Sequence, residues 1–243
     1  MSFSTRLLLA LPLLAACGAA PAEDSGTSAD DLSSKTLDAY FELAGDSNND
    51  QWIEAIALHA DGSFEANMGN DVSNLSGHHF AETGTYTLDA SALVLNGERW
   101  DVTRSGDTLR VKGNVTWFTM KKTPLVTLTF AADWTVSQSA PLVANEALLV
   151  RYAASRDACK APAKGGLFVS ALAQVDDGLV TGLTDEFGSQ PVHGFLGALG
   201  FVPQGKDLAL WFESGATDSQ GGSTCSHWDS RFGQNYHFAI ATK

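Results

Sequence analysis

The chain has 243 residues, of which 44% are hydrophobic and 18% charged. This is the composition of a globular protein, and it excludes wholesale disorder, collagen and a long coiled coil. Asp and Glu outnumber Lys and Arg by 28 to 15, which gives a formal net charge of −13. Because an acidic chain repels phosphate backbones, we expect no nucleic acid partner.

The first sixteen residues have the pattern of a secretory signal peptide, with a positive charge at Arg6 and an apolar run from Leu7 to Ala16. That run is shorter than the roughly 20 apolar residues that a membrane-spanning helix needs. It leads into Leu14-Ala15-Ala16-Cys17, which resembles the lipobox of bacterial lipoproteins. The resemblance implies that residues 1–16 are removed, that the Cys17 thiol carries a diacylglyceryl group, and that the new N-terminus is usually acylated. An ordinary signal peptide cut near Ala20 is the alternative.

Lipidation of Cys17 makes the lipid bilayer the first expected partner. Two or three acyl chains hold a protein firmly on a membrane, whereas a single chain holds it only marginally. Cys17 is followed by Gly18 and not by the Asp that resembles an inner-membrane retention signal. We therefore expect the bacterial outer membrane, on its periplasmic or surface face. Residues 17–35 are small, polar and acidic, which predicts a flexible lipidated tether.

Residues 36–122 have the short strands and tight turns of a small antiparallel β domain. Asp61-Gly62 between apolar runs predicts one hairpin, and Ser105-Gly106-Asp107 predicts another. The segments 58–64, 84–88 and 107–111 resemble successive strand motifs of small lipocalin-like bacterial domains. Only Leu37 to Leu43 has a helical pattern, and it is brief.

Alternation between apolar and polar residues restarts after Thr123-Pro124, where we place a domain boundary. Strands at short spacing with glycine-rich turns predict a β-sandwich over residues 123–243. In the segment 207–213 the even-numbered apolar residues share one face, and Trp211 lies on the other. The expected fold class is therefore all-β, a lipocalin-like β domain followed by a β-sandwich.

The most distinctive stretch of the sequence runs from Cys225 to Phe238 and reads CSHWDSRFGQNYHF. Together with an upstream cysteine, Cys159, it resembles a family of uncharacterised secreted bacterial domains. The resemblance covers the chain from about Pro124 to its end. It implies no activity, because none is established for that family.

The same stretch also resembles, more loosely, the last strands of starch-binding β-sandwich modules. In their order, Trp228, Asp229, Gly233, Asn235 and Tyr236 match that pattern, while a serine replaces the expected Asn after the Asp. The resemblance implies that Trp228 stacks on a sugar and that Asp229 and Asn235 bind its hydroxyls or a calcium ion. The structural alternative is a turn. In that reading Asp229 bonds the amides that follow it, Gly233 takes a positive φ, and the Asn235 carboxamide satisfies the loop backbone.

If Cys17 carries lipid, Cys159 and Cys225 remain as a pair in an oxidising compartment, which predicts a disulfide. The alternative is a metal site made of Cys159, Cys225 and His227. However, Cys-x-His is not a recognised zinc spacing, and a fourth ligand is not evident. We therefore expect no metal and no cofactor.

The sequence contains no G-x-S-x-G, H-E-x-x-H, P-loop or G-x-G-x-x-G motif, so we expect no enzymatic activity. The predicted function is that of a membrane-anchored bacterial lipoprotein with a binding or envelope-structural role, whose partner is a glycan or an envelope protein. One alternative is a carbohydrate-binding module that uses the turn from Trp228 to Tyr236. A second alternative is a hydrolase with an acid pair that no motif reveals.

Overall fold

The computed structural model describes residues 37–45, 49–70, 78–159, 165–183, 187, 191, 193–220 and 222–241. The expected signal peptide, the lipidation site Cys17 and the tether lie outside these residues. The described residues all belong to one compact unit. They form strands with one short 3₁₀ turn, Ala154–Arg156, so the all-β prediction is confirmed.

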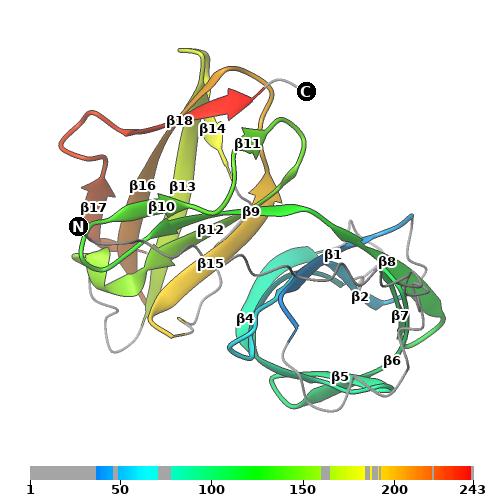
Figure 1. Cartoon of the computed structure of the whole chain (residues 1–243). Coiled ribbons are helices and arrows are strands. Elements are labelled where there is room, and N and C mark those ends of the chain that lie inside the picture. Colours follow the sequence, from blue (N-terminus) through cyan, green and yellow to red (C-terminus); the bar gives the residue numbers. More distant parts are fainter. Residues whose placement is uncertain are drawn as a thin grey trace, which may run out of the picture. The chain divides into compact units, whose positions relative to one another are not determined.

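Eight strands close into an antiparallel barrel (Figure 1). Each strand pairs with the next one along the chain, and β1 closes the ring by pairing with β8. The barrel strands are β1 (Ala39–Leu43), β2 (Gln51–Leu58), β3 (Ser63–Asn70), β4 (His78–Leu88), β5 (Ala92–Leu95), β6 (Glu98–Ser105), β7 (Thr108–Lys112) and β8 (Trp117–Thr123).

Tight turns between consecutive strands produce this simple order. Gly62 follows Asp61 with φ +81° and joins β2 to β3, and Gly106 with φ +54° joins β6 to β7. Both hairpins were predicted. Asn96-Gly97, with φ +48° and +91°, joins β5 to β6. Positive φ at both central residues gives the turn a twist that matches the twist of the flanking strands.

The helix predicted for Leu37 to Leu43 is wrong, because Ala39–Leu43 is strand β1. Its residues pair with β2 on one side and with β8 on the other, for example Tyr40 with Ala57 and with Thr123. These partners lie 17 and 83 residues away in the sequence. Pairing at long range decides the conformation here, and a weak local helical pattern is overridden.

Apolar side chains from all eight strands fill the interior of the barrel. In β6 and β7 the inward residues alternate with exposed ones, as expected for strands with one face in a core. The buried interior comprises Phe41, Ile53, Ile56, Leu58, Phe64, Ala66, Met68, Tyr86, Leu88, Leu93, Leu95, Trp100, Val102, Leu109, Val111, Phe118 and Met120.

Beyond Pro124 the chain forms two further sheets. The four-stranded sheet has the order β10-β9-β12-β15, and the six-stranded sheet has the order β11-β18-β16-β13-β14, with β17 also paired to β16. The strands are β9 (Leu125–Phe130), β10 (Val136–Gln138), β11 (Leu142–Val143), β12 (Ala147–Ala153), β13 (Gly165–Val175), β14 (Val180–Gly182), β15 (Phe195–Phe201), β16 (Asp207–Asp218), β17 (Ser223–Asp229) and β18 (Tyr236–Ala241).

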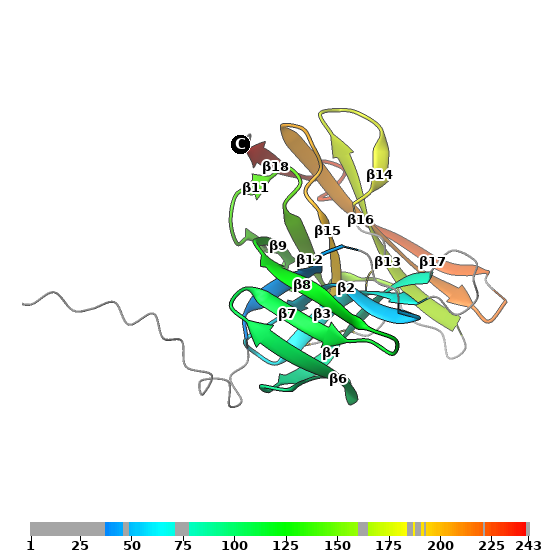
Figure 2. The ribbon, with the colours of Figure 1, turned by 90° about the vertical axis from the view of Figure 1, so that its right-hand side faces the viewer.

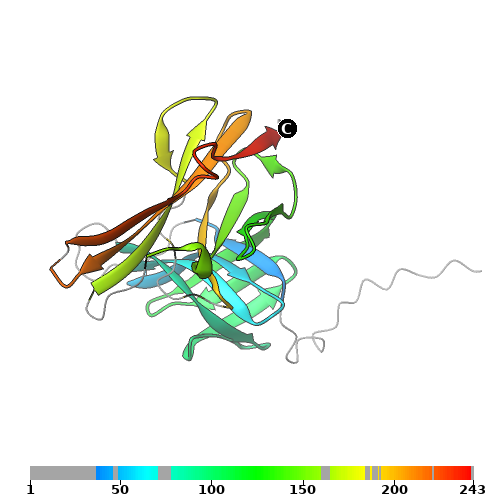
Figure 3. The same ribbon diagram turned by 90° about the vertical axis from the view of Figure 1, so that its left-hand side faces the viewer.

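The two sheets share one hydrophobic core and so form the predicted sandwich. Phe130 and Tyr152 come from the four-stranded sheet, and both rings pack against Phe212 of the six-stranded sheet at centroid distances of 4.5 and 4.3 Å. In β16, Leu208, Leu210 and Phe212 are buried, while Trp211 lies on the opposite face, as predicted. The strands β13, β16 and β17 lie side by side (Figures 2 and 3).

Strand β12 is buried on both faces. Leu148, Val150 and Tyr152 face the sandwich core, whereas Leu149 joins a small cluster with Tyr40, Ala55 and Ala57 of the barrel. A buried polar contact accompanies this cluster, because Glu65 of β3 lies 3.3 Å from Arg151 Nε and also contacts His59. The domain boundary at Thr123-Pro124 predicts that residues 123–243 fold alone, and this prediction must allow for the interface.

Candidate functional site

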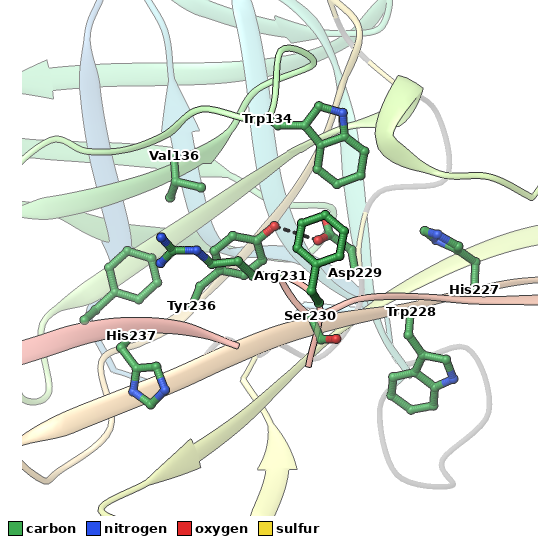
Figure 4. Close-up of a pocket in the computed structure, with 11 residues that line it drawn as sticks. Trp134, Val136, His227, Trp228, Asp229, Ser230, Arg231, Tyr236 and His237 are labelled. Carbon is green, nitrogen blue, oxygen red and sulfur yellow. Dashed lines mark hydrogen bonds between the residues drawn. The ribbon is translucent and has the colours of Figure 1, made fainter. Parts of the chain in front are cut away.

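A cavity of about 1020 Å³ opens in the sandwich beside β17 and β18 (Figure 4). We call it the aromatic groove. Its walls come from the β9–β10 hairpin, from β17, from the turn between β17 and β18, and from β18 itself. The lining residues are Trp134, Val136, His227, Trp228, Asp229, Ser230, Arg231, Phe232, Tyr236, His237 and Phe238.

Trp134 stands in the tight turn of the β9–β10 hairpin. Its N–H donates to the Ala131 carbonyl at 3.0 Å, and the Ala131 N–H donates to the Thr135 carbonyl at 2.9 Å. The Asp133 carboxylate accepts hydrogen bonds from the Thr135 hydroxyl and N–H, and these bonds hold the pKa of Asp133 below its usual value. The sequence therefore closes this turn with local polar groups.

The backbone of Trp134 has φ +67°, and its side chain is 59% exposed. Hairpin turns normally place Gly or Asn at such a position. A bulky residue in the left-handed region costs about 1–2 kcal/mol. Strain of this kind is concentrated at functional positions, and here it holds an indole ring over the groove.

Arg156 lies beneath the Trp134 ring. Its guanidinium carbon is 4.6 Å from the ring centroid, and its side chain is fully buried. The rings of Phe130, Tyr152 and Tyr236 lie 5.5–5.6 Å from the same carbon. A desolvated cation surrounded by ring faces is held more strongly than an exposed one, so Arg156 fixes the position of the aromatic walls.

A buried ion pair forms the floor of the groove. Arg156 Nε lies 3.1 Å from Asp229 Oδ2, and Arg156 Nη2 donates to the Tyr236 hydroxyl at 2.6 Å. That hydroxyl donates in turn to Asp229 Oδ1 at 2.6 Å. Burial, with a further contribution from the hydrogen bond to Asp229, raises the pKa of Tyr236 to about 12. The tyrosine is therefore a neutral donor, and Asp229 is neutralised by its arginine.

The turn from Ser230 to Asn235 forms the rim of the groove. Arg231, Phe232 and Gly233 have φ of +48°, +61° and +82°, and the Phe232 side chain is fully exposed. The Asn235 N–H donates to the Ser230 carbonyl at 2.8 Å, and the Gly233 N–H donates to the Ser230 hydroxyl at 3.1 Å.

The positive φ predicted for Gly233 is confirmed, but the Asx-turn predicted for Asp229 is wrong. Ser230 caps the turn instead, because the buried Arg156 takes the Asp229 carboxylate. Asn235 contributes its own positive φ of +56° and its backbone N–H to the turn.

The structure divides the predicted ligand-binding set. Asp229 and Tyr236 meet in the floor, whereas Trp228, which also lines the groove, extends from the other face of β17 (Figure 4), as neighbouring residues in a strand must. Trp228 is 51% exposed, so it is not packed in a core. Asn235 does not line the groove.

Sequence reasoning missed Trp134, Phe232 and Arg156. Trp134 did carry a signal: it is a bulky apolar residue in the short turn from Ala131 to Thr135, between two segments of alternating pattern. Arg156 carried no signal, because its partner Asp229 is 73 residues away and only the folded sandwich brings them together.

The structure joins Cys159 and Cys225 in a disulfide with a Cα–Cα distance of 5.7 Å, as predicted. It ties the segment after the 3₁₀ turn to β17, close to the groove. Because both sulfurs are used in this bond, the alternative metal site with His227 is wrong. Within the described residues, no group of three or more His, Cys, Asp or Glu side chains could hold a metal ion.

The fold and the groove define an all-β protein in which a packed barrel accompanies a sandwich with an aromatic recess. Residues 123–243, the whole sandwich, match the model of a family of unknown function (DUF6209), in agreement with the resemblance to an uncharacterised domain family. No curated protein and no solved structure matches the chain. In the part of the chain that the structure describes, no helix has the length and apolarity needed to cross a membrane.

Proposed function

We propose that the sandwich is a carbohydrate-binding domain and that its ligand lies in the aromatic groove. The observation that carries this proposal is the presence of exposed aromatic rings on two separate turns, Trp134 and Phe232, each held at a positive φ. Sugar rings present apolar faces that aromatic rings can cover without a charge. A site with apolar walls and a few polar groups is the usual form of a small-molecule pocket.

Polar groups in the groove support a hydroxyl-rich ligand. The Ser230 hydroxyl lies at the rim, where it already accepts one N–H and can still donate. His227 Nδ1 is buried and has no hydrogen-bond partner among the described residues. A buried polar atom without a partner is costly, and a rotation of the His227 ring, which lines the groove, would let a sugar hydroxyl satisfy it.

Binding is better supported than hydrolysis. A glycoside hydrolase needs two carboxyl groups about 5–10 Å apart across the bond that is cleaved. Among the residues that line the groove, Asp229 is the sole carboxylate, and its charge is committed to Arg156. We therefore propose recognition without turnover at this site.

The barrel is assigned no ligand in this proposal. A lipocalin-like domain, which residues 36–122 resemble, would suggest a ligand inside the barrel, but large side chains such as Phe41, Phe64 and Trp100 occupy that interior. In a small barrel, an interior filled by side chains leaves no cavity for a ligand. In our proposal the barrel acts as a rigid spacer between the tether and the sandwich.

The proposed setting is the bacterial cell envelope, with the protein anchored by acyl chains on Cys17 in the outer membrane. The lipobox resemblance supports this part of the proposal. Replacing Cys17 with Ala should abolish labelling by a fatty-acid probe and release the protein from the membrane fraction. Unchanged labelling of that variant would refute the anchor and leave the groove proposal standing.

A glycan array tests the groove directly, because one substitution removes the ring and keeps the turn. Glycine adopts positive φ freely, so Trp134→Gly should retain the hairpin. We expect dissociation constants from micromolar to millimolar for the wild type, equivalent to about −8 to −4 kcal/mol. The variant should bind about tenfold or more weakly, with a melting temperature close to that of the wild type.

Two controls accompany the array. Trp117→Ala removes another partly exposed tryptophan, on barrel strand β8, and should leave binding unchanged. Trp228→Ala tests the other face of β17. A loss of affinity as large as that of Trp134→Gly would show that the ligand lies mainly on that face. If the wild type binds no saccharide, or if Trp134→Gly binds as the wild type does, the proposed function is wrong.

A further inference from the structure

One charged side chain in the aromatic groove has no role in the floor or the turn. Arg231 lies in the turn after β17, lines the groove and is exposed. Among the described residues, no carboxylate lies within 4.0 Å of its guanidinium, whereas Arg99, Arg151 and Arg156 each have such a partner. Figure 4 shows Arg231 on the side of the groove where Val136 and Tyr236 lie.

The acidic groups of the groove and of the elements that carry its lining residues are already engaged. Asp229 pairs with Arg156 in the floor, and Asp207 lies 2.7 Å from His237 Nδ1. Asp133, in the hairpin that carries Trp134, accepts two hydrogen bonds from Thr135. Arg231 is therefore the unpaired positive charge of the groove, in a chain whose formal net charge is −13.

The backbone of Arg231 also has an unusual conformation. Arg231 has φ +48°, and residues with a β-carbon occupy this region rarely, with Asn and Asp the usual exceptions. The next residue, Phe232, also has a positive φ of +61° and presents its whole ring to solvent. The turn thus presents a cation and an aromatic ring at consecutive positions on the rim.

We propose that the groove selects saccharides that carry a carboxylate, such as uronic acid oligomers, and that Arg231 is the residue that selects them. The proposal rests on the carbohydrate-binding function proposed above. A guanidinium offers parallel N–H donors that match the two oxygens of a planar carboxylate. The sugar ring lies against the aromatic wall while its carboxylate meets Arg231.

The test uses pairs of oligosaccharides that differ only in oxidation at C6: glucose with glucuronate, galactose with galacturonate, and mannose with mannuronate, each in one linkage and one length. Calorimetric titration of the purified protein with each pair gives the ratio of affinities. We expect the uronate of at least one pair to bind about three- to tenfold more tightly than its neutral partner. Because salt screens exposed charges, the ratio should shrink as salt is raised.

The variant Arg231→Gln should bind the neutral and the acidic member of that pair equally. Arg231→Lys should keep part of the preference, since it retains the charge and loses the parallel donors. Arg99→Gln, which removes an exposed arginine from the barrel, should leave the ratio at its wild-type value.

The outcomes separate the two proposals. Equal affinity of the wild type for both members of every pair would overturn the selection of carboxylates and leave the carbohydrate-binding function intact. A preference that survives in Arg231→Gln would overturn the assignment to Arg231. Equal or tighter binding of 6-sulfated counterparts would show that the charge, and not the planar carboxylate, is selected. Absence of binding to every saccharide would overturn both proposals.

Discussion

In the barrel every strand pairs antiparallel with the next strand along the chain, whereas in the sandwich β9 pairs in parallel with β12 and β11 pairs in parallel with β18. The barrel is closed and has no strand edge, and large aliphatic and aromatic side chains pack in its interior. The sandwich leaves its sheets open and buries Arg156 and Asp229 next to its core.

This difference indicates where the chemistry of the molecule is concentrated. Buried charges cost free energy and are kept only where geometry pairs them well, and non-glycine residues at positive φ add strain. In the sandwich both features occur around one groove, at Arg156, Asp229, Trp134 and Phe232. The barrel core has no comparable cluster among the described residues. The predictions below test this contrast.

The largest expected effect comes from the disulfide, which occurs in the sandwich. Replacing Cys159 and Cys225 with Ser removes a bond that spans 66 sequence positions and should lower the free energy of unfolding by about 4 kcal/mol. Chemical denaturation measures this change. Hydrogen exchange should accelerate in β16 and β17 and stay slow in β7 of the barrel. Cys17→Ala is the matched control, and an unchanged midpoint for the double serine variant would contradict the prediction.

The buried ion pair should have the next largest effect. Arg156→Met keeps the volume of the side chain but leaves the Asp229 carboxylate buried without its cation, which should cost about 3 kcal/mol. Changing Asp229 to Leu as well should recover part of that loss, because no buried charge then remains. The control Arg99→Met breaks an exposed pair with Asp101 in the barrel and should cost less than about 1 kcal/mol. A double variant as unstable as Arg156→Met alone would argue against the ion pair as the cause.

A smaller effect is expected at the contact between the barrel and the four-stranded sheet. Glu65 contacts both His59 and Arg151, and Gly197 leaves the space that its side chain occupies. Glu65→Gln keeps the shape and removes the charge, so we expect a loss of about 2 kcal/mol. Unfolding monitored by one probe in the barrel and another in the sandwich should then show two transitions with different midpoints. Equal stability of wild type and variant would mean that the contact is dispensable, and it would favour independent folding of residues 123–243.

Turn chemistry made much of the fold predictable. Asp61-Gly62 and Ser105-Gly106-Asp107 mark hairpins because their conformations are set by the residues themselves. The alternation of apolar and polar residues predicted which face of β9 and of β16 is buried, because one side of each strand lies in a core. The conformation of Ala39–Leu43 depends instead on partners far along the chain, and no local pattern reports them.

The candidate site was predictable only in part, for the same reason. The sequence pointed to the segment that contains Asp229 and Tyr236, and these residues do line the groove. Their roles depend on Arg156, which reaches them through the packing of two sheets. Trp134 enters the site because the parallel pairing of β9 with β12 brings its hairpin over the 3₁₀ turn that carries Arg156.

The parallel pairing of β11 with β18 has a consequence for the order in which the protein matures. Leu142 pairs with Ile240, so the sandwich core cannot be completed until residue 240 has been synthesised, whereas the barrel needs only the chain up to Thr123. At ordinary rates of translation the intervening residues take on the order of ten seconds. Throughout that interval Phe130 and Tyr152 lack the cover of Tyr236 and Ile240. When the chain emerges from its N-terminus, in synthesis or in export, the barrel can therefore close while the apolar face of the unfinished sandwich is still exposed, and at this stage a holding chaperone would matter most.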